Sequence, residues 1–187
     1  EQWNQTFGGS SWDQGFAIQQ TTDGGYAITG FTESSGNGSY DVWLIKTDSE
    51  GNEQWNRTYG GSEADEAYSL IQTSDGGYIL LGRTQSYGNG AADVWLIKTN
   101  SEGDEQWNQT YGGTDWDIGY SLDQTSDNGF IIVGGTSSYG SGENDAWLIK
   151  TDSEGIELWN EIYGGSEGDQ FSSIQQTIDA GFILTGY

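Results

Sequence analysis

The sequence predicts an all-β protein, a β-propeller built from blades of four short strands, and two observations carry this prediction. The first is a strict repeat, because Trp3-Asn4 returns at Trp55, Trp107 and Trp159 in steps of 52 residues (55 − 3 = 52), without insertion or deletion. The second is the strand-like pattern of each copy, in which short apolar or alternating runs are separated by glycine-containing turns. A parallel β-helix is the main alternative, but its coils are much shorter than this repeat.

Four strands are expected in each copy, as the second one illustrates. An alternating run (53–59, EQWNRTY) ends at a glycine pair, and the next run (68–73, YSLIQT) leads into the turn SDGG (74–77), whose glycines can adopt positive φ angles. The short apolar run YILLG (78–82) is typical of a strand that is buried on both faces. After a polar loop, DVWLIKT (93–99) provides the fourth strand. No segment has the period of an amphipathic helix.

The copies do not fill a whole number of blades. Three of the four strand types occur four times, but the Trp-Leu-Ile-Lys type occurs three times, which gives 15 strands and an incomplete last blade. We therefore expect one array over residues 1–187, which is either a segment of a longer chain or an assembling subunit, because unpaired strand edges promote association. Its expected parts are an outer strand at 1–7 and units that begin near residues 8, 60, 112 and 164.

The composition excludes several classes of partner and chemistry. Lys and Arg together number 5 against 29 Asp and Glu, so the net charge is -24. Such a surface repels nucleic acid and anionic lipid, and no apolar run approaches the roughly 20 residues of a membrane span. The sequence has no His and no Cys, which excludes Ser-His-Asp and Cys-His catalysis and the usual zinc sites. We expect neither a nucleic-acid partner nor membrane insertion.

The repeat unit resembles a kelch-type blade. Residues 78–82 (YILLG) and 130–135 (FIIVGG) look like the second kelch strand with its glycines, and the run that begins at Asp93 and continues to Trp107 looks like the third and fourth strands. The units look closer still to arrays of Trp-Asn-x-Thr-Tyr-Gly-Gly and Gln-Thr-x-Asp-Gly-Gly-Tyr in large secreted or cell-surface proteins of archaea and bacteria. That resemblance implies an extracellular or cell-surface β-propeller, often within a longer polypeptide.

Each copy contains a Thr-x-Asp-x-Gly turn that resembles an Asp-box hairpin. Its carboxylate can accept hydrogen bonds from backbone N–H groups inside the turn. Because all four copies carry it, we interpret the turn as a folding device and not as a catalytic one. The four aspartates are Asp23, Asp75, Asp127 and Asp179.

A second set of aspartates follows each Gly-Gly-Ser/Thr sequence, near other carboxylates. Oxygen-rich loops of this kind could hold Ca²⁺, the one cofactor we consider, although the spacing matches no EF-hand. The alternative is that these carboxylates cap turns by accepting backbone hydrogen bonds. The candidates are Asp13, Asp65, Asp117 and Asp169.

Aromatic residues in the loops are candidates for ligand binding. Trp12 and Trp116 stand where other copies have Ala64 and Gly168. Aromatic rings on one loop face could stack on sugar rings, so we predict a glycan-binding face around Trp12, Tyr87 and Trp116; the alternative is ordinary loop packing. The full candidate set is Trp12, Tyr40, Tyr87, Trp116 and Tyr139.

Two further repeated features have simple explanations. Asn-x-Ser/Thr sequons occur at Asn4, Asn37, Asn56 and Asn108 and would be glycosylation sites in a secreted protein. Three of the four lie on a repeated strand, so the repeat alone accounts for them. The lysines of the Trp-Leu-Ile-Lys strands are expected to form ion pairs with carboxylates of neighbouring strands or blades; they are Lys46, Lys98 and Lys150.

Near-perfect repetition argues against one specialised catalytic cleft. We therefore predict a non-catalytic, extracellular or cell-surface structural and interaction module that can self-assemble, with other copies or further blades as partners. The main alternative is a carbohydrate-binding, lectin-like propeller with glycans as ligands. A glycan-active enzyme domain is a weaker one, since two carboxylates suffice for a glycosidase but sialidase chemistry needs more arginines than Arg57 and Arg83.

Overall fold

The computed structural model describes residues 3–187, which form fourteen β-strands in antiparallel sheets and contain no helix, so no helix able to span a membrane is present in this range. The first sheet contains β1 (Asp13–Gln20), β2 (Tyr26–Thr32), β3 (Asp41–Thr47) and β4 (Glu53–Tyr59). The second contains β5 (Asp65–Gln72), β6 (Tyr78–Thr84), β7 (Asp93–Thr99) and β8 (Glu105–Tyr111). The third contains β9 (Asp117–Gln124), β10 (Phe130–Thr136), β11 (Asp145–Thr151) and β12 (Glu157–Tyr163). The last contains β13 (Phe171–Gln176) and β14 (Phe182–Gly186).

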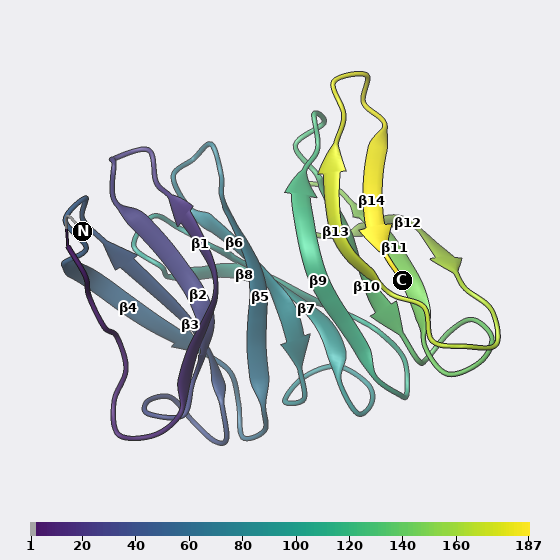
Figure 1. Ribbon diagram of the computed structural model, residues 1–187, viewed down its shortest axis with the longest axis horizontal. Coiled ribbons are helices and arrows are strands. Elements are labelled where there is room, and N and C mark those ends of the chain that lie inside the picture. The colour runs from purple at the N-terminus through teal and green to yellow at the C-terminus, as the bar shows by residue number, and fades with distance from the viewer. Residues whose placement is uncertain (1–2) are drawn as a thin grey trace.

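The strands of every sheet follow chain order, each paired with the next as a hairpin. The sheets lie side by side from the N-terminal to the C-terminal end of the molecule (Figure 1). Their first strands are neighbours, since β1 contacts β5, β5 contacts β9 and β9 contacts β13. The first strand of each later sheet also contacts the second and third strands of the sheet before it. Consecutive sheets therefore pack face to face.

Apolar layers between the sheets form the core. Val42 and Leu44 pack with Leu80 and Ile97 between the first and second sheets. The next layer lies between the second and third sheets, and a smaller one joins the third to the last. The middle strands β7, β10 and β11 are buried along their whole length, which explains their continuous apolar sequences. The outer strands β4, β8 and β12 are edges and are more polar and exposed.

The prediction of an outer strand at residues 1–7 is wrong for the residues that the structure describes. Residues 3–12 contain no strand, and residues 1–2 lie outside the described part, so the strands number fourteen and not fifteen. The other three copies of this segment, β4, β8 and β12, each pair with a Trp-Leu-Ile-Lys strand. All three such strands of this sequence are thereby occupied. Trp3 still packs on Tyr26 with ring centroids 5.8 Å apart, much as Trp55 packs on Tyr78 at 6.0 Å.

Candidate functional site

The first strand of each sheet carries a β-bulge at the same repeat position. Opposite the bulge lies a glycine of the second strand, where an added Cβ would collide with a backbone carbonyl oxygen of the bulged strand, as at Gly82 against Glu66. This close approach explains a glycine in every copy. Bulges turn one side chain out of the regular alternation. The bulged residues are Phe16, Tyr68, Tyr120 and Ser172.

Three of these bulged residues form a row of aromatic rings across neighbouring sheets. The ring centroids of Phe16 and Tyr68 lie 5.0 Å apart, and those of Tyr68 and Tyr120 lie 5.7 Å apart. We call Phe16, Tyr68 and Tyr120 the inner aromatic row. Phe16 is exposed, whereas Tyr68 and Tyr120 are half-buried. The row thus presents aromatic surface along β1, β5 and β9.

An ion pair that occurs in one copy borders this row. The Arg83 Nη2 atom donates to Glu66 Oε1 at 2.8 Å, and its Nε atom donates to the Tyr68 hydroxyl at 3.0 Å. The Tyr68 hydroxyl itself donates to Glu66. The guanidinium also lies over the Trp116 ring, 5.1 Å from the ring centroid. Arg83 is thus held by two residues of its partner strand β5 and by Trp116, the residue before β9.

The pKa values of Arg83 and Tyr68 are both raised by their surroundings. Burial lowers the pKa of Arg83, but the hydrogen bond to Glu66 and the nearby negative charge outweigh it and raise this pKa overall. Burial, followed by the hydrogen bond to Glu66, raises the pKa of Tyr68. These two side chains therefore titrate far from neutral pH, whereas general acid–base catalysts titrate near the working pH.

Three of the five aromatic residues singled out from the sequence lie beside the inner aromatic row. Trp12 contacts Phe31 at 5.8 Å and Tyr40 at 6.5 Å between ring centroids. Phe31 in turn contacts Phe16 at 5.9 Å. Trp12 is 60% exposed and Trp116, under Arg83, is 43% exposed.

The other two predicted residues lie elsewhere and act in loop packing. The Tyr87 ring packs on Trp95 at 5.3 Å, and its hydroxyl donates to the Gly60 carbonyl oxygen at 2.9 Å. Tyr139 makes the same contacts with Trp147 at 5.6 Å and with the Gly112 carbonyl oxygen at 2.8 Å. Tyr87 therefore lies apart from Trp12 and Trp116, and the three residues do not form the single face that the sequence predicts.

Sequence reasoning missed the inner aromatic row and the Glu66–Arg83 pair. A signal was present at Arg83, whose position varies among the copies while the flanking glycine and threonine, Gly82 and Thr84 in this copy, do not. The position of Arg83 holds Phe31, Gly135 and Tyr187 in the other units, and the position of Tyr68 holds Ser172 in the last one. Positions that depart from the strict repeat indicate where one unit makes side-chain contacts that the other units do not make.

The aspartates that are candidates for binding Ca²⁺ accept hydrogen bonds from donors within the protein. Asp65 accepts hydrogen bonds from Gly61 N at 2.9 Å, from Ser86 Oγ at 2.7 Å and from the Thr84 hydroxyl. Within residues 3–187, no group of three or more acidic side chains is arranged to hold a metal ion. This geometry is that of turn capping. In their own units, Asp13, Asp117 and Asp169 accept a hydrogen bond from the N–H group of the corresponding glycine.

The aspartates of the Thr-x-Asp-x-Gly turns accept hydrogen bonds inside the turn, and three of the four also pair with a lysine of the same sheet. Asp75 Oδ1 accepts from the Thr73 hydroxyl at 2.6 Å and from Gly77 N at 3.0 Å, while Lys98 Nζ lies 3.0 Å from Oδ2. These hydrogen bonds, that from Thr73 foremost, lower the pKa of Asp75 to about 2. Asp23 pairs with Lys46 and Asp127 with Lys150 in the same way. Asp179 keeps the bonds from Thr177 and Gly181.

The sequon asparagines on the repeated strand hold tryptophan rings. Asn56 accepts a hydrogen bond from Trp43 Nε1 at 3.3 Å, and Asn108 accepts one from Trp95 Nε1 at 3.1 Å. Asn160, which has no sequon, does the same for Trp147 at 3.1 Å. This shared role accounts for the repeated asparagine. Asn37 lies in the exposed loop between β2 and β3, and Asn4 lies in the segment before β1.

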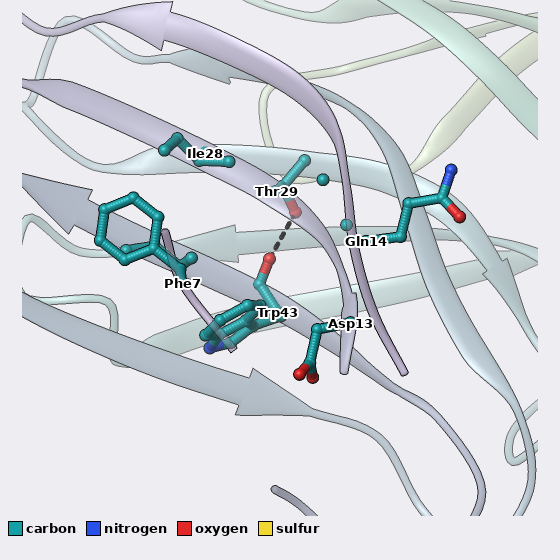
Figure 2. A pocket seen from close by; sticks show the side chains of 9 residues that line it. Phe7, Asp13, Gln14, Ile28, Thr29 and Trp43 are labelled. Carbon is teal, nitrogen blue, oxygen red and sulfur yellow. Dashed lines mark hydrogen bonds between the residues drawn. The ribbon is translucent and has the colours of Figure 1, made fainter. Parts of the chain in front are cut away.

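A hollow lies on the face of the first sheet that no other sheet covers. Figure 2 shows its lining, in which Phe7 from the N-terminal segment approaches Ile28 and Trp43, and the Thr29 hydroxyl donates to the Trp43 carbonyl oxygen at 3.0 Å. In the second sheet, Leu80 and Trp95 take the places of Ile28 and Trp43 and are buried against the first sheet. The hollow thus marks a place where a neighbouring sheet would pack.

Comparison with known proteins gives limited relationships. No protein-family model matches the sequence. The chain is 31% identical over 187 aligned positions to the regulatory protein FlaEY of Caulobacter vibrioides, covering 84% of this chain and 20% of that protein. It therefore spans about a fifth of the length of this relative. Among solved structures it resembles a protein of unknown function from Bacteroides caccae, with a TM-score of 0.55, 9% identity, and coverage of 91% of this chain and 52% of that one. That likeness concerns the fold alone.

Proposed function

We propose that this chain is a non-catalytic interaction scaffold, part of a kelch-like β-propeller in an extracellular or cell-surface protein. The observation that carries the proposal is the stacking of equivalent four-stranded sheets, each covered by the first strand of the next. Adjacent first strands are what blades around a common axis require. The alignment with about a fifth of FlaEY supports the view that such units occur within longer polypeptides.

The non-catalytic part of the proposal rests on what the ionisable groups do. The carboxylates at repeated positions bind backbone N–H groups, hydroxyls and lysines of their own units. The unrepeated pair, Glu66 and Arg83, is held within a closed set of hydrogen bonds. Side chains committed in this way stabilise the fold and leave loop surfaces for contacts with partners.

The test is exposure on intact cells that produce the protein. An antibody against the folded chain should bind to intact, unlysed cells. The purified protein should not hydrolyse any glycoside of a test panel. Antibody binding that requires lysis, or turnover of a glycoside at a rate proportional to protein concentration, would contradict the proposal. Hexose increments on the intact mass would add support for an extracellular location.

Carbohydrate binding is a second candidate, favoured by the exposed rings of Trp12 and Trp116 beside the inner aromatic row and of Phe16 within it. Isothermal titration with neutral oligosaccharides should show binding that Trp116→Ala weakens, with Tyr139→Ala as a control of similar exposure outside this surface. Unchanged binding after Trp116→Ala, or none with the unmodified protein, would remove this candidate.

A further inference from the structure

The two end sheets leave two faces uncovered. The head face is the side of the first sheet turned away from the second, and it carries Ile18, Ile28 and Trp43. Ile18 is 64% exposed, whereas its equivalents in the following sheets, Leu70 and Leu122, are 7% and 5% exposed. The head face therefore exposes positions that a preceding sheet covers elsewhere in the chain.

The tail face is the side of β13–β14 turned away from the third sheet, and it carries Gln175, Ile178, Ile183 and Tyr187. Ile183 is 62% exposed, whereas Ile79, at the same position of the second sheet, is 0% exposed. Tyr187 is 77% exposed. The tail face therefore exposes positions that a following sheet covers elsewhere.

We propose that the head face of one molecule packs on the tail face of a second copy of this chain, repeating the contact between consecutive sheets. This inference rests on the proposed scaffold role and names its partner. Within the chain, the first strand of each later sheet packs on three strands of the preceding sheet, and β13–β14 provides two of those three. Most of the contact surface is thus present on the tail face.

The hydrogen bonds between backbone N–H groups and glutamine side chains that join consecutive sheets can form at this junction too. Between the first two sheets, Gln72 N donates to Gln19 Oε1 at 2.7 Å, and Thr22 N donates to Gln72 Oε1 at 2.9 Å. Gln20 stands where Gln72 does, and Gln175 stands where Gln19 does. The residues needed for the same pair of hydrogen bonds are therefore present on the two free faces.

The side chain that would make these bonds already has the required conformation. Gln20 Nε2 donates to the Gly24 carbonyl oxygen at 3.4 Å, as Gln72 Nε2 donates to the Gly76 carbonyl oxygen at 3.3 Å. The Oε1 atom of Gln20 therefore has the orientation with which Gln72 accepts from Thr22 N. At the junction its donor would be the backbone N–H of Ile178, which stands at the position of Thr22.

A ring contact completes the match. Arg83 of the second sheet stacks on Trp116 of the third. Tyr187 stands at the position of Arg83 in the last sheet, and Trp12 stands at the position of Trp116 in the first. The junction therefore brings Tyr187 against Trp12, both of them exposed aromatic rings that favour burial against each other.

A second copy suits these faces because they match each other and lie apart within residues 3–187. Figure 1 places β1–β4 and β13–β14 at opposite ends of the row of sheets. A contact between unlike faces closes into a ring or continues as a chain of molecules. The net charge of -24 on each copy opposes the contact, and salt screens this repulsion.

Sedimentation of the purified chain across a range of concentrations in moderate salt tests the contact. The mass should rise from 20.3 kDa to a multiple of it as concentration increases. Trp12→Asp and Tyr187→Asp should each weaken association at least about tenfold, as expected for buried aromatic anchors of an interface. Ile156→Asp is the matched control, because Ile156 is 50% exposed and lies in the turn before β12, away from both faces.

Mixing the two variants decides the orientation. Trp12→Asp leaves the tail face intact and Tyr187→Asp leaves the head face intact, so an equimolar mixture should associate more tightly than either variant alone. A folded wild-type chain that stays monomeric at all concentrations, or a mixture that does not associate, would overturn the contact. Either result would leave the scaffold proposal standing, because that depends on cell-surface exposure and on the absence of glycoside turnover.

Discussion

Equivalent residues in the middle and at the ends of the row of sheets differ sharply in burial. Ile79 and Ile183 occupy the same repeat position, yet the first is 0% exposed and the second 62%. Leu70 and Ile18 are another such pair, at 7% and 64%. Because the local sequence is nearly the same, the neighbouring sheet decides whether a side chain belongs to the core. Stability in such an array is a sum over units and the contacts between them.

The largest expected difference in stability between the middle sheets and the end sheets follows from shortening an apolar side chain. Ile79→Ala removes side-chain contacts from the layer between the second and third sheets and should lower the free energy of unfolding by about 2–5 kcal/mol. Ile183→Ala removes a side chain that is already exposed and should cost less than about 1 kcal/mol. Urea unfolding of both variants at low protein concentration checks this. Equal losses would mean that β13–β14 is covered in the monomer.

A smaller difference is expected for a tyrosine hydroxyl. The Tyr111 hydroxyl is buried and donates to the Gly155 carbonyl oxygen at 2.5 Å, so Tyr111→Phe leaves that acceptor unpaired and should cost about 1–3 kcal/mol. Tyr163 stands at the same repeat position in the third sheet and is 49% exposed. Tyr163→Phe should therefore change the free energy of unfolding by less than about 0.5 kcal/mol. Thermal unfolding of the two variants, followed by circular dichroism, measures the difference, and similar shifts would contradict it.

The repeat predicted the sheets well because each unit carries its own hairpin turns and apolar strands. Strands such as β6 and β10 lie where the apolar runs indicated. The segment at residues 3–7 has the sequence of an outer strand but forms none, because strand formation depends on a partner that local sequence does not encode. A sequence pattern therefore predicts that a segment can form a strand, and the presence of a pairing partner decides whether it does.

The candidate site was harder to predict than the fold. Nothing in the sequence shows that Phe16, Tyr68 and Tyr120 sit at bulges, because a bulge changes the register without changing the composition of the strand. The sequence places Tyr87 and Tyr139 in loops, which makes them binding candidates alongside Trp12. Their hydroxyls instead bind glycine carbonyl oxygens of the preceding glycine pairs, a long-range contact that spacing along the chain cannot reveal.

The smallest expected difference between middle and end is electrostatic and depends on pH. Hydrogen bonds from Thr125, then from Gly129 and Lys150, lower the pKa of Asp127 to about 2. Hydrogen bonds from Thr177, from Gly181 and from its own backbone N–H lower the pKa of Asp179, and no lysine contributes. A carboxyl with an unfolded pKa of about 4 stabilises the fold fully above that value and loses the effect as the pH falls toward about 2. The gap in unfolding free energy between wild type and Asp127→Asn should therefore be widest at neutral pH and narrow through this window.

The same measurement on Asp179→Asn should give a smaller gap, because no lysine pairs with Asp179 among residues 3–187, whereas Lys150 pairs with Asp127. Urea unfolding at several pH values above and below about 4 follows both variants against wild type. A gap for Asp127→Asn that stays constant across this range would show that its ionised form contributes nothing to stability. A gap for Asp179→Asn as wide as that for Asp127→Asn would show that the turn, and not Lys150, provides the stabilisation.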